Sequence, residues 1–160
     1  MVCIDLQPED KDRLHHFYIS LDKTVTDTFR PFPETTLAIF QKHLEEAKAG
    51  HHISIGLDRS TGIVGHGFIM NIDKPHPVFG IGIKDIFHGK GWGRMLMRAV
   101  FEKAGEREVK HMALTVLKHN NNALSLYRSF GFKVVTDHTF KVENDSYLMQ
   151  YEAGAGSCTK

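Results

Sequence analysis

The chain has 160 residues, a length that suits one domain with a sizeable hydrophobic core. Twenty basic and nineteen acidic residues leave a formal net charge of +1, which excludes a bulk field that favours nucleic acid or an anionic membrane. The two cysteines, Cys3 and Cys158, lie far apart in the sequence, and no apolar run reaches the about 18 residues of a membrane span. A reducing cytoplasm is the simplest setting for such a chain.

The first third of the chain alternates between apolar strand and amphipathic helix patterns. Residues 2–6 predict a short strand, and a helix is expected from Pro8 to about residue 20. Residues 22–33 lose periodicity and end in two prolines, so a loop is expected there. A second helix is predicted from Glu34 to Gly50, with its apolar residues on one face.

From His51 the period of the pattern shortens to that of strands. Residues 1–152 are interpreted as one domain, and residues 153–160 as a flexible tail. The elements expected within the second part of the domain are strands from residue 53, at 63–72 and at 78–84, a helix from Trp92, a strand at 111–116, a helix at 121–130, and a final hairpin of 133–142 with 146–152.

Residues 81–96 combine a β-branched strand, a loop with glycines at positions 89, 91 and 93, and the start of a helix. Glycines lack a Cβ that would block a close ligand, and a helix N-terminus leaves backbone N–H groups free at the positive end of its dipole. This stretch therefore predicts a phosphate site. The dinucleotide pattern GxGxxG is excluded, because Arg94 and Leu96 stand where its last glycine would be. The P-loop is excluded as well, because Gly91 follows Lys90.

The loop His88-Gly89-Lys90-Gly91-Trp92-Gly93 resembles the acyl-CoA loop of the GNAT superfamily of N-acetyltransferases, with His88 in place of the family's Arg or Gln. A second stretch, residues 114–132, resembles the other signature of that family. It consists of an apolar strand, Asn120, Ala123 and Leu126-Tyr127 at the family's spacing, and a closing Gly131-Phe132. On these two motifs the chain is identified as a member of the GNAT superfamily.

The resemblance implies an α/β domain with a mixed, mostly antiparallel sheet of six to seven strands and helices on both faces. It also implies that the strand before the loop and the strand at 114–116 pair at one end and splay at the other. The pantetheine arm of acetyl-CoA, the implied co-substrate, would enter between them and bond the backbone near Ile81, Gly82 and Ile83. Gly80 and Gly82 suit a β-bulge, or they only relieve crowding.

The resemblance also assigns roles to individual side chains. Tyr127 is implied as the proton donor to the departing CoA thiolate, or it is a core tyrosine whose hydroxyl is tied to backbone. Asn120 caps a helix, bonds the CoA arm, or does both. His88 in its charged form donates to the pyrophosphate, or it points to solvent and the backbone alone holds the phosphates. The implied cofactor-binding set is Ile81, Gly82, Ile83, His88, Gly89, Lys90, Gly91, Trp92, Gly93, Arg94, Asn120, Ala123 and Tyr127.

The implied reaction is transfer of an acetyl group to a primary amine by direct attack in a ternary complex. The strand at 78–83 lacks a carboxylate that could act as base, so His76, Glu34 and Asp27 are candidates, or the amine enters neutral. Asp27, Phe29, Phe32 and Glu34 are the candidate acceptor-binding residues, and Phe140 is a further apolar wall.

A small amine, a peptide N-terminus and a lysine side chain all stay open as acceptors. The alternative function is an acyl-CoA sensor without turnover. No metal site is expected, because the His15-His16 and His51-His52 pairs are adjacent and no HExxH motif occurs. The sequence leaves open whether the chain forms a homodimer.

Overall fold

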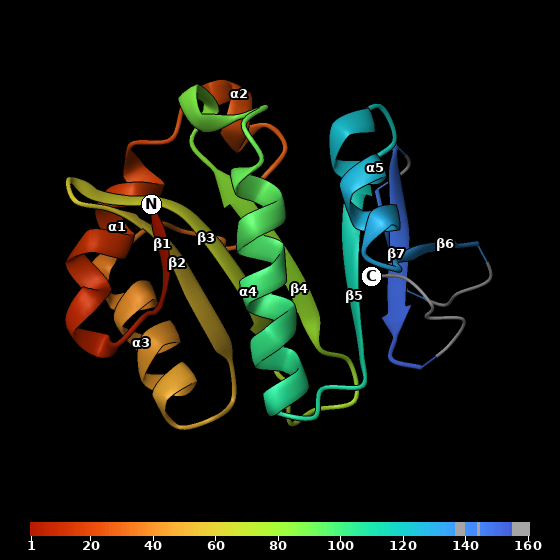
Figure 1. Ribbon diagram of the computed structural model, residues 1–160, viewed down its shortest axis with the longest axis horizontal. Helices are drawn as coiled ribbons and strands as arrows, with labels where there is room; N and C mark the ends of the chain where they lie inside the picture. The colour runs from red at the N-terminus through yellow and green to blue at the C-terminus, as the bar shows by residue number, and fades with distance from the viewer. Residues whose placement is uncertain (137–139, 144, 155–160) are drawn as a thin grey trace.

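A single mixed sheet organises the chain in a computed structural model that describes residues 1–136, 140–143 and 145–154 (Figure 1). Its seven strands lie in the order β1-β2-β3-β4-β5-β7-β6. Every neighbouring pair is antiparallel except β4 and β5, which are parallel. The strands are β1 Val2–Asp5, β2 Ile53–Arg59, β3 Gly62–Met70, β4 Val78–Ile83, β5 His111–Leu117, β6 Lys133–Val135 and β7 Ser146–Glu152.

Helices cover both faces of this sheet, which confirms the predicted architecture. One core joins the sheet to α4 and α5, and a second core joins it to α1 and α3. The helices are η1 Pro8–Asp10, α1 Lys11–Ile19, α2 Lys23–Thr26, α3 Leu37–Lys48, η2 Asp85–Phe87, α4 Trp92–Glu106 and α5 Asn121–Ser129.

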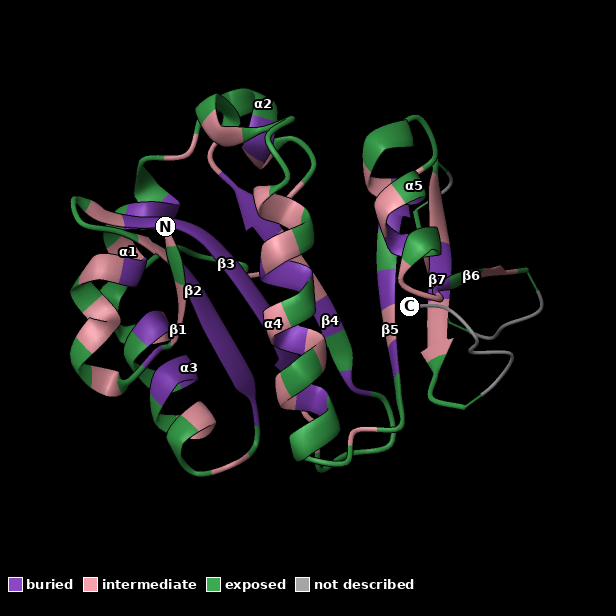
Figure 2. Ribbon diagram, in the orientation of Figure 1, coloured by how far each residue is buried: buried purple, intermediate pink, exposed green. Residues whose placement is uncertain are grey.

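Strand β3 shows how one sequence serves both layers, because successive side chains point to opposite faces. A Cβ at Gly67 would meet Val100 of α4, so this position lies close under that helix. The neighbouring His66 and Phe68 point to the other face, where the ring of Tyr18 from α1 contacts His66. Almost all of β2 and β3 is therefore buried, as Figure 2 shows in purple.

The loop predicted at residues 22–33 contains a helix, α2, so the prediction was wrong over Lys23–Thr26. The carbonyl of Asp22 accepts from the N–H groups of Val25 and Thr26, which makes a single turn. One turn is too short to produce a period in the sequence. The second helix also begins later than predicted, at Leu37, since the Thr36 hydroxyl accepts from the N–H of Ile39 and caps it.

Strands β4 and β5 pair only at Val78 and Ala113, which confirms the predicted splay. Beyond that pair the two strands diverge toward the start of α4 (Figure 1). The predicted bulge at Gly80 and Gly82 was wrong, because β4 pairs with β3 in unbroken register from Met70–Val78 to Gly65–Ile83. A Cβ at Gly80 would overlap the ring of Phe68, and one at Gly82 would overlap the ring of Phe29. The two glycines relieve crowding.

The last hairpin differs from its prediction in its first strand, which ends at Val135 and not at residue 142. Residues 140–142 lie against the face of the sheet and line a hollow there, so they do not extend the β6–β7 ladder. Parts of the predicted hairpin, residues 137–139 and 144, lie outside the described residues. Most of the predicted tail, residues 155–160, lies outside them as well.

Candidate active site

The glycine loop between η2 and α4 turns through left-handed backbone at two positions. Gly89 has a φ of 74° and Gly91 a φ of 83°. Nothing lies within 4 Å of a Cβ built at either position, so space does not require glycine there. The backbone conformation does, because residues with a Cβ rarely adopt it.

The loop and first turn of α4 present a row of free backbone donors. Within the described part of the chain, none of the N–H groups of residues 89–94 donates a hydrogen bond. The first intrahelical donor is Met95, whose N–H donates to the carbonyl of Gly91 at 3.1 Å. Six consecutive N–H groups at the positive end of a 15-residue helix form a site for an anion with several oxygens.

His88 folds back onto the strand that precedes it. Its Nε2–H donates to the carbonyl of Ile83 at 2.7 Å, and its Nδ1 lies 3.6 Å from a carboxylate oxygen of Asp85. The side chain is 52% exposed. The ring therefore closes the turn that leads into the loop, and it uses the carbonyl of Ile83, one of the residues whose backbone was expected to bond the pantetheine arm. Ile81 stays half-buried beside the splay.

The remaining predicted residues of the loop differ in what they contact. Arg94 reaches from α4 to α5, where its Nη1 donates to the Ser129 hydroxyl at 3.2 Å and its guanidinium stacks on the Phe130 ring at 5.6 Å. Trp92 packs against the core, whereas Lys90 is exposed. A Cβ at Gly93 would meet Leu126 at 3.5 Å, so α4 and α5 approach each other closely there.

Asn120 begins α5 as its N-cap. Its Oδ1 accepts from the N–H of Ala123 at 3.3 Å, which confirms the capping role. Ala123 lies half-buried against the core, one helical turn before Tyr127. The structure thus places Asn120, Ala123 and Tyr127 along the helix that borders the splayed strands.

Tyr127 is buried, with 9% of its surface exposed, between the rings of Phe79 and Phe132. Burial raises the pKa of its phenol to about 12, because the phenolate would lose its hydration. Its hydroxyl makes no hydrogen bond to the described residues, and it is not one of the fully enclosed side-chain atoms that lack a partner. The alternative of a core tyrosine tied to backbone therefore does not hold, and the hydroxyl is available to a ligand.

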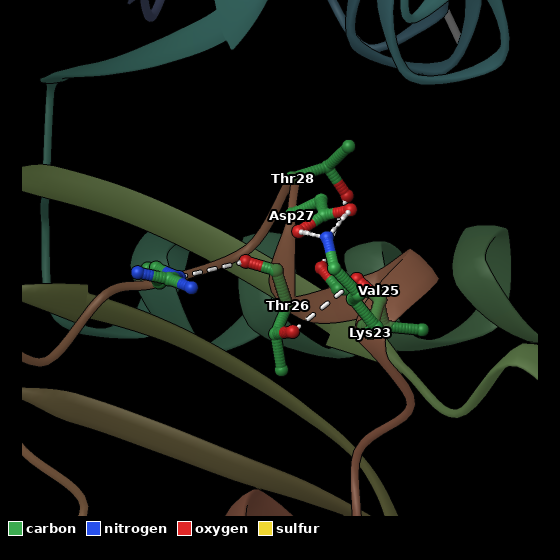
Figure 3. A network of polar contacts seen from close by, with 6 residues as sticks. Lys23, Val25, Thr26, Asp27 and Thr28 are labelled. Carbon is green, nitrogen blue, oxygen red and sulfur yellow. Dashed lines mark hydrogen bonds and ion pairs between the residues drawn. The ribbon is translucent and has the colours of Figure 1, made fainter.

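The residues predicted to bind the acceptor divide into two groups. Phe29, Phe32 and Glu34 line one hollow of about 430 Å³, which Tyr18 and Arg30 also border; we call it the α1–α2 hollow. Asp27 is not part of it. Both carboxylate oxygens of Asp27 accept from the ammonium of Lys23 at 2.9 Å, as Figure 3 shows, so this acid is paired within α2 and its cap.

A second hollow, of about 400 Å³, lies where β4 and β5 pair; we call it the β4–β5 hollow. His76 and Phe140, both considered from the sequence, border it, and their rings meet edge to face at 4.9 Å. Val78, Ala113 and Leu148 also line it and were missed. Their alternation within β-strands was visible in the sequence, but which strands lie side by side was not.

Neither a membrane helix nor a metal cluster is found in the described ranges. None of their helices has the length and apolarity to cross a bilayer. No three His, Cys, Asp or Glu side chains within those ranges lie close enough to share a metal ion.

The geometry agrees with what comparison of the sequence finds. Residues 14–132 match the model of the acetyltransferase (GNAT) family, which is more than half of the chain. The chain belongs to the GNAT acetyltransferase family. It is 30% identical over 116 residues to the N-alpha-acetyltransferase RimI of Mycobacterium tuberculosis, covering 68% of this chain and 72% of that protein.

Other curated relatives match over shorter stretches. The uncharacterized N-acetyltransferase YobR of Bacillus subtilis is 30% identical over 77 residues, covering 48% of this chain and 31% of that protein. YdgE of the same organism is 31% identical over 65 residues, covering 38% of this chain. This GNAT chain thus matches 31% and 41% of the lengths of these two relatives.

Solved structures share the whole fold at low identity. The PaiA N-acetyltransferase of Thermoplasma acidophilum, solved with coenzyme A, superposes with a TM-score of 0.75 at 14% identity, covering 94% of this chain and 98% of that one. YncA of Salmonella typhimurium, a putative acetyltransferase solved with acetyl-CoA, gives a TM-score of 0.75 at 16% identity, covering 95% and 93%. At these identities the likeness establishes the fold.

Proposed function

We propose that this GNAT protein transfers an acetyl group from acetyl-CoA to a primary amine by direct attack in a ternary complex. The observation that carries the proposal is the row of six free N–H groups at residues 89–94, placed beside the splayed ends of β4 and β5. A diphosphate has the oxygens that such a row binds. The splay leaves facing strand edges without a ladder, which an extended pantetheine arm can use.

The cofactor-binding residues act mainly through backbone. Gly89 and Gly91 hold the loop in the conformation that exposes its N–H groups, and His88 fixes the approach from β4 through the Ile83 carbonyl. The N–H of Ile81 and the end of β4 would receive the arm. Asn120 holds the start of α5 in place, while Ala123 leaves room next to the arm.

Tyr127 is proposed to act on the leaving group. The amine nitrogen attacks the thioester carbon, the C–S bond breaks, the nitrogen loses a proton, and the sulfur gains one. A phenol with a pKa of about 12 stays protonated throughout neutral pH, so it always has a hydrogen for the developing thiolate. Because that pKa exceeds the about 8.5 of an ordinary thiol, the phenol stabilises the leaving sulfur mainly by donating a hydrogen bond. A proton that the sulfur takes from the phenol is replaced from the solvent, which also receives the proton that the nitrogen loses.

The base is supplied by the solution or by the acceptor itself in this proposal. Asp27 is paired with Lys23, Glu34 is exposed at the α1–α2 hollow, and His76 is exposed beside Phe140. None of these groups lies on β4 next to the splay. An amine that enters neutral needs no base for its attack, so the rate should rise with pH toward the pKa of the free amine.

Two measurements on the full chain test the function. Acetyl-CoA should raise the melting temperature, since a ligand that binds only the folded state stabilises it by mass action. Release of CoA thiol should then follow addition of an amine from a panel that contains a small amine, a peptide N-terminus and a lysine peptide. A raised melting temperature with no thiol release from any amine would favour the acyl-CoA sensor instead.

A further inference from the structure

The face of β4 that points away from α4 is covered at two of its three positions. Val78, Gly80 and Gly82 share this face, because side chains alternate along a strand. The ring of Phe68 covers Gly80 and the ring of Phe29 covers Gly82. Val78 is 44% exposed. An acceptor that approaches β4 from this side therefore has open surface at Val78.

Val78 is also where β4 meets β5, so it stands at the closed end of the splay. A thioester that enters between the strands from the loop end travels toward this point. The β4–β5 hollow opens here: β5 contributes Ala113 and Thr115, and their partners in β7 are Gln150 and Leu148. The hollow is thus the cavity that adjoins the end of the splayed strands.

The walls of this hollow are mostly apolar and carry no net formal charge. Its apolar lining includes Val78, Ala113, Phe140, Val142, Leu148, Pro75 and Pro77. The charged side chains of the lining are Lys141 and Glu152, which are exposed and of opposite sign. Such walls favour an apolar group. They have no excess charge that would attract an acceptor carrying a carboxylate, or an ammonium group besides the reacting amine.

The α1–α2 hollow is a separate space. Phe29 covers Gly82 on one side and lines the α1–α2 hollow on the other. It stacks on Tyr18 at 5.8 Å and contacts Phe68 at 6.4 Å, so aromatic side chains stand between the two hollows. An acceptor in the β4–β5 hollow would be separated from the α1–α2 hollow by these aromatic side chains.

We propose that the β4–β5 hollow binds the acceptor, and that the acceptor is a primary amine carried on an apolar body, aromatic or branched aliphatic. The body fills the hollow, and the amine points along β4 toward the thioester. The bond changes are those of the proposed acetyl transfer, on which this inference rests. Val78 is the specificity-determining residue because it joins the hollow to the strand.

The test compares 2-phenylethylamine with 1,4-diaminobutane as acceptors for the full chain, with CoA release as the readout. The kcat/KM for 2-phenylethylamine should exceed that for the diamine at least about 10-fold, as expected when an apolar pocket receives several methylene equivalents. Val78→Asp should lower kcat/KM for 2-phenylethylamine about 10-fold or more, mainly through KM, without changing KM for acetyl-CoA. Val2→Asp is the matched control, since Val2 is 55% exposed on the far edge strand β1.

Equal kcat/KM values of Val78→Asp and Val2→Asp for 2-phenylethylamine would show that the hollow does not bind the acceptor. The proposed acetyltransferase function would not be affected by that result. Preference for the diamine would overturn the substrate class. It is also possible to test the hollow when acetyl-CoA raises the melting temperature but no amine releases CoA. Calorimetry then measures the affinity of the CoA complex for 2-phenylethylamine, and equal affinities of wild type and Val78→Asp would refute the proposal. If acetyl-CoA does not bind either, the proposed function itself fails. Val78→Asn replaces Val78→Asp if the charged variant does not fold.

Discussion

Two buried tyrosines, Tyr18 and Tyr127, lie in regions that differ in the hydrogen-bond partners they offer to the phenol hydroxyl. Both phenols have a pKa raised by burial, to about 12 at Tyr127 and well above the usual value at Tyr18. The Tyr18 hydroxyl lies 2.7 Å from Nδ1 of His66, whereas the Tyr127 hydroxyl makes no hydrogen bond to the described residues. Burial sets the protonation state in both regions, but only hydrogen bonding decides which phenol is free to react.

The partner of Tyr18 belongs to a longer polar chain inside the core of α1 and α3. His66 Nε2 lies 2.8 Å from the Ser54 hydroxyl, and that hydroxyl lies 3.0 Å from Nε2 of His43. With Tyr18 as donor the chain runs to His43 and leaves its enclosed Nδ1–H without a partner. The reverse direction would leave both the Tyr18 hydrogen and the His43 lone pair unsatisfied, so the first direction is favoured.

The groups of the polar chain are almost fully buried, so we infer that the chain stabilises the packing of α1 and α3 on the sheet. His66 is 0% exposed, Ser54 is 5% exposed, and Tyr18 stacks on Phe40 at 4.8 Å. The Tyr127 region has the opposite character: apolar rings around one unpaired hydroxyl beside the splay. The difference predicts that mutations in the first region change stability and those in the second change turnover.

Tyr127→Phe tests the cofactor side with the largest expected effect. Loss of the donor to the leaving sulfur should lower kcat about 100-fold, or about 2.7 kcal/mol, because positioned proton donors contribute of that order. Acetyl-CoA binding and the free energy of unfolding should stay nearly unchanged, since the hydroxyl has no described partner to lose. Steady-state kinetics and thermal melts measure both quantities. A matched loss of acetyl-CoA binding and turnover would make Tyr127 a packing residue.

Tyr18→Phe tests the other side with the opposite expectation. Removal of its hydroxyl leaves the buried Nδ1 of His66 unpaired, which should lower the free energy of unfolding by about 2 kcal/mol. Urea unfolding measures this loss. At temperatures where the variant is folded, kcat should stay within about twofold of wild type, because mutations outside the site spare transition-state contacts. A large loss of kcat in the folded variant would contradict the division between the two regions.

Acid should weaken the fold through the polar chain. Burial, with the nearby His52 as a further cause, lowers the pKa of His43 from 6.5 to about 3, and burial lowers the pKa of His66 as well. The folded state keeps these rings neutral while the unfolded state gains protons below about pH 6.5, so stability is full above that pH and falls as the pH drops toward 3. Each ring contributes a slope of about 1.4 kcal/mol per pH unit within its window.

The slope is measured by urea unfolding between pH 7.5 and 4.5. In His43→Leu the unfolded state should bind one proton fewer relative to the folded state than in wild type. The free energy of unfolding should therefore depend less steeply on pH, even though it is lower than that of wild type at pH 7.5. A wild-type free energy of unfolding that is constant from pH 6.5 to 4.5 would show that the buried histidines do not resist protonation.

The smallest expected effect concerns the glycine loop and leaves both tyrosines in place. Gly91→Ala should cost about 1 kcal/mol of stability, because alanine is strained at a φ of 83°. It should also weaken acetyl-CoA binding, since the free N–H groups move. Gly105→Ala is the control: this helical glycine has no crowding within 4 Å and should stabilise the protein by about 0.5–1 kcal/mol. Calorimetry of acetyl-CoA on both variants separates loop geometry from general stability.

The sequence by itself determined the elements that local pattern encodes. The strand, loop and helix around Gly89 and Gly91, the cap at Asn120, and the alternation of β4 are all visible as short-range order in residue type. Periodicity gave the order of strands and helices, and two motifs gave the family and, through that resemblance, the fold class, because these features depend on spacing along the chain. The single turn α2 was missed, since one turn has no period.

Tertiary structure alone decided what meets across the sheet. The pairing of Val78 with Ala113, the rings of Phe68 and Phe29 over two glycines, and the tie of His88 to Ile83 each depend on distances between segments that sequence spacing does not encode. The same holds for the two tyrosines. Their burial could be guessed from apolar neighbours, but only tertiary packing decided their partners. The contact of α1 with β3 gave Tyr18 a histidine partner, whereas Tyr127 of α5 lies against the rings of Phe79 and Phe132 and makes no hydrogen bond to the described residues.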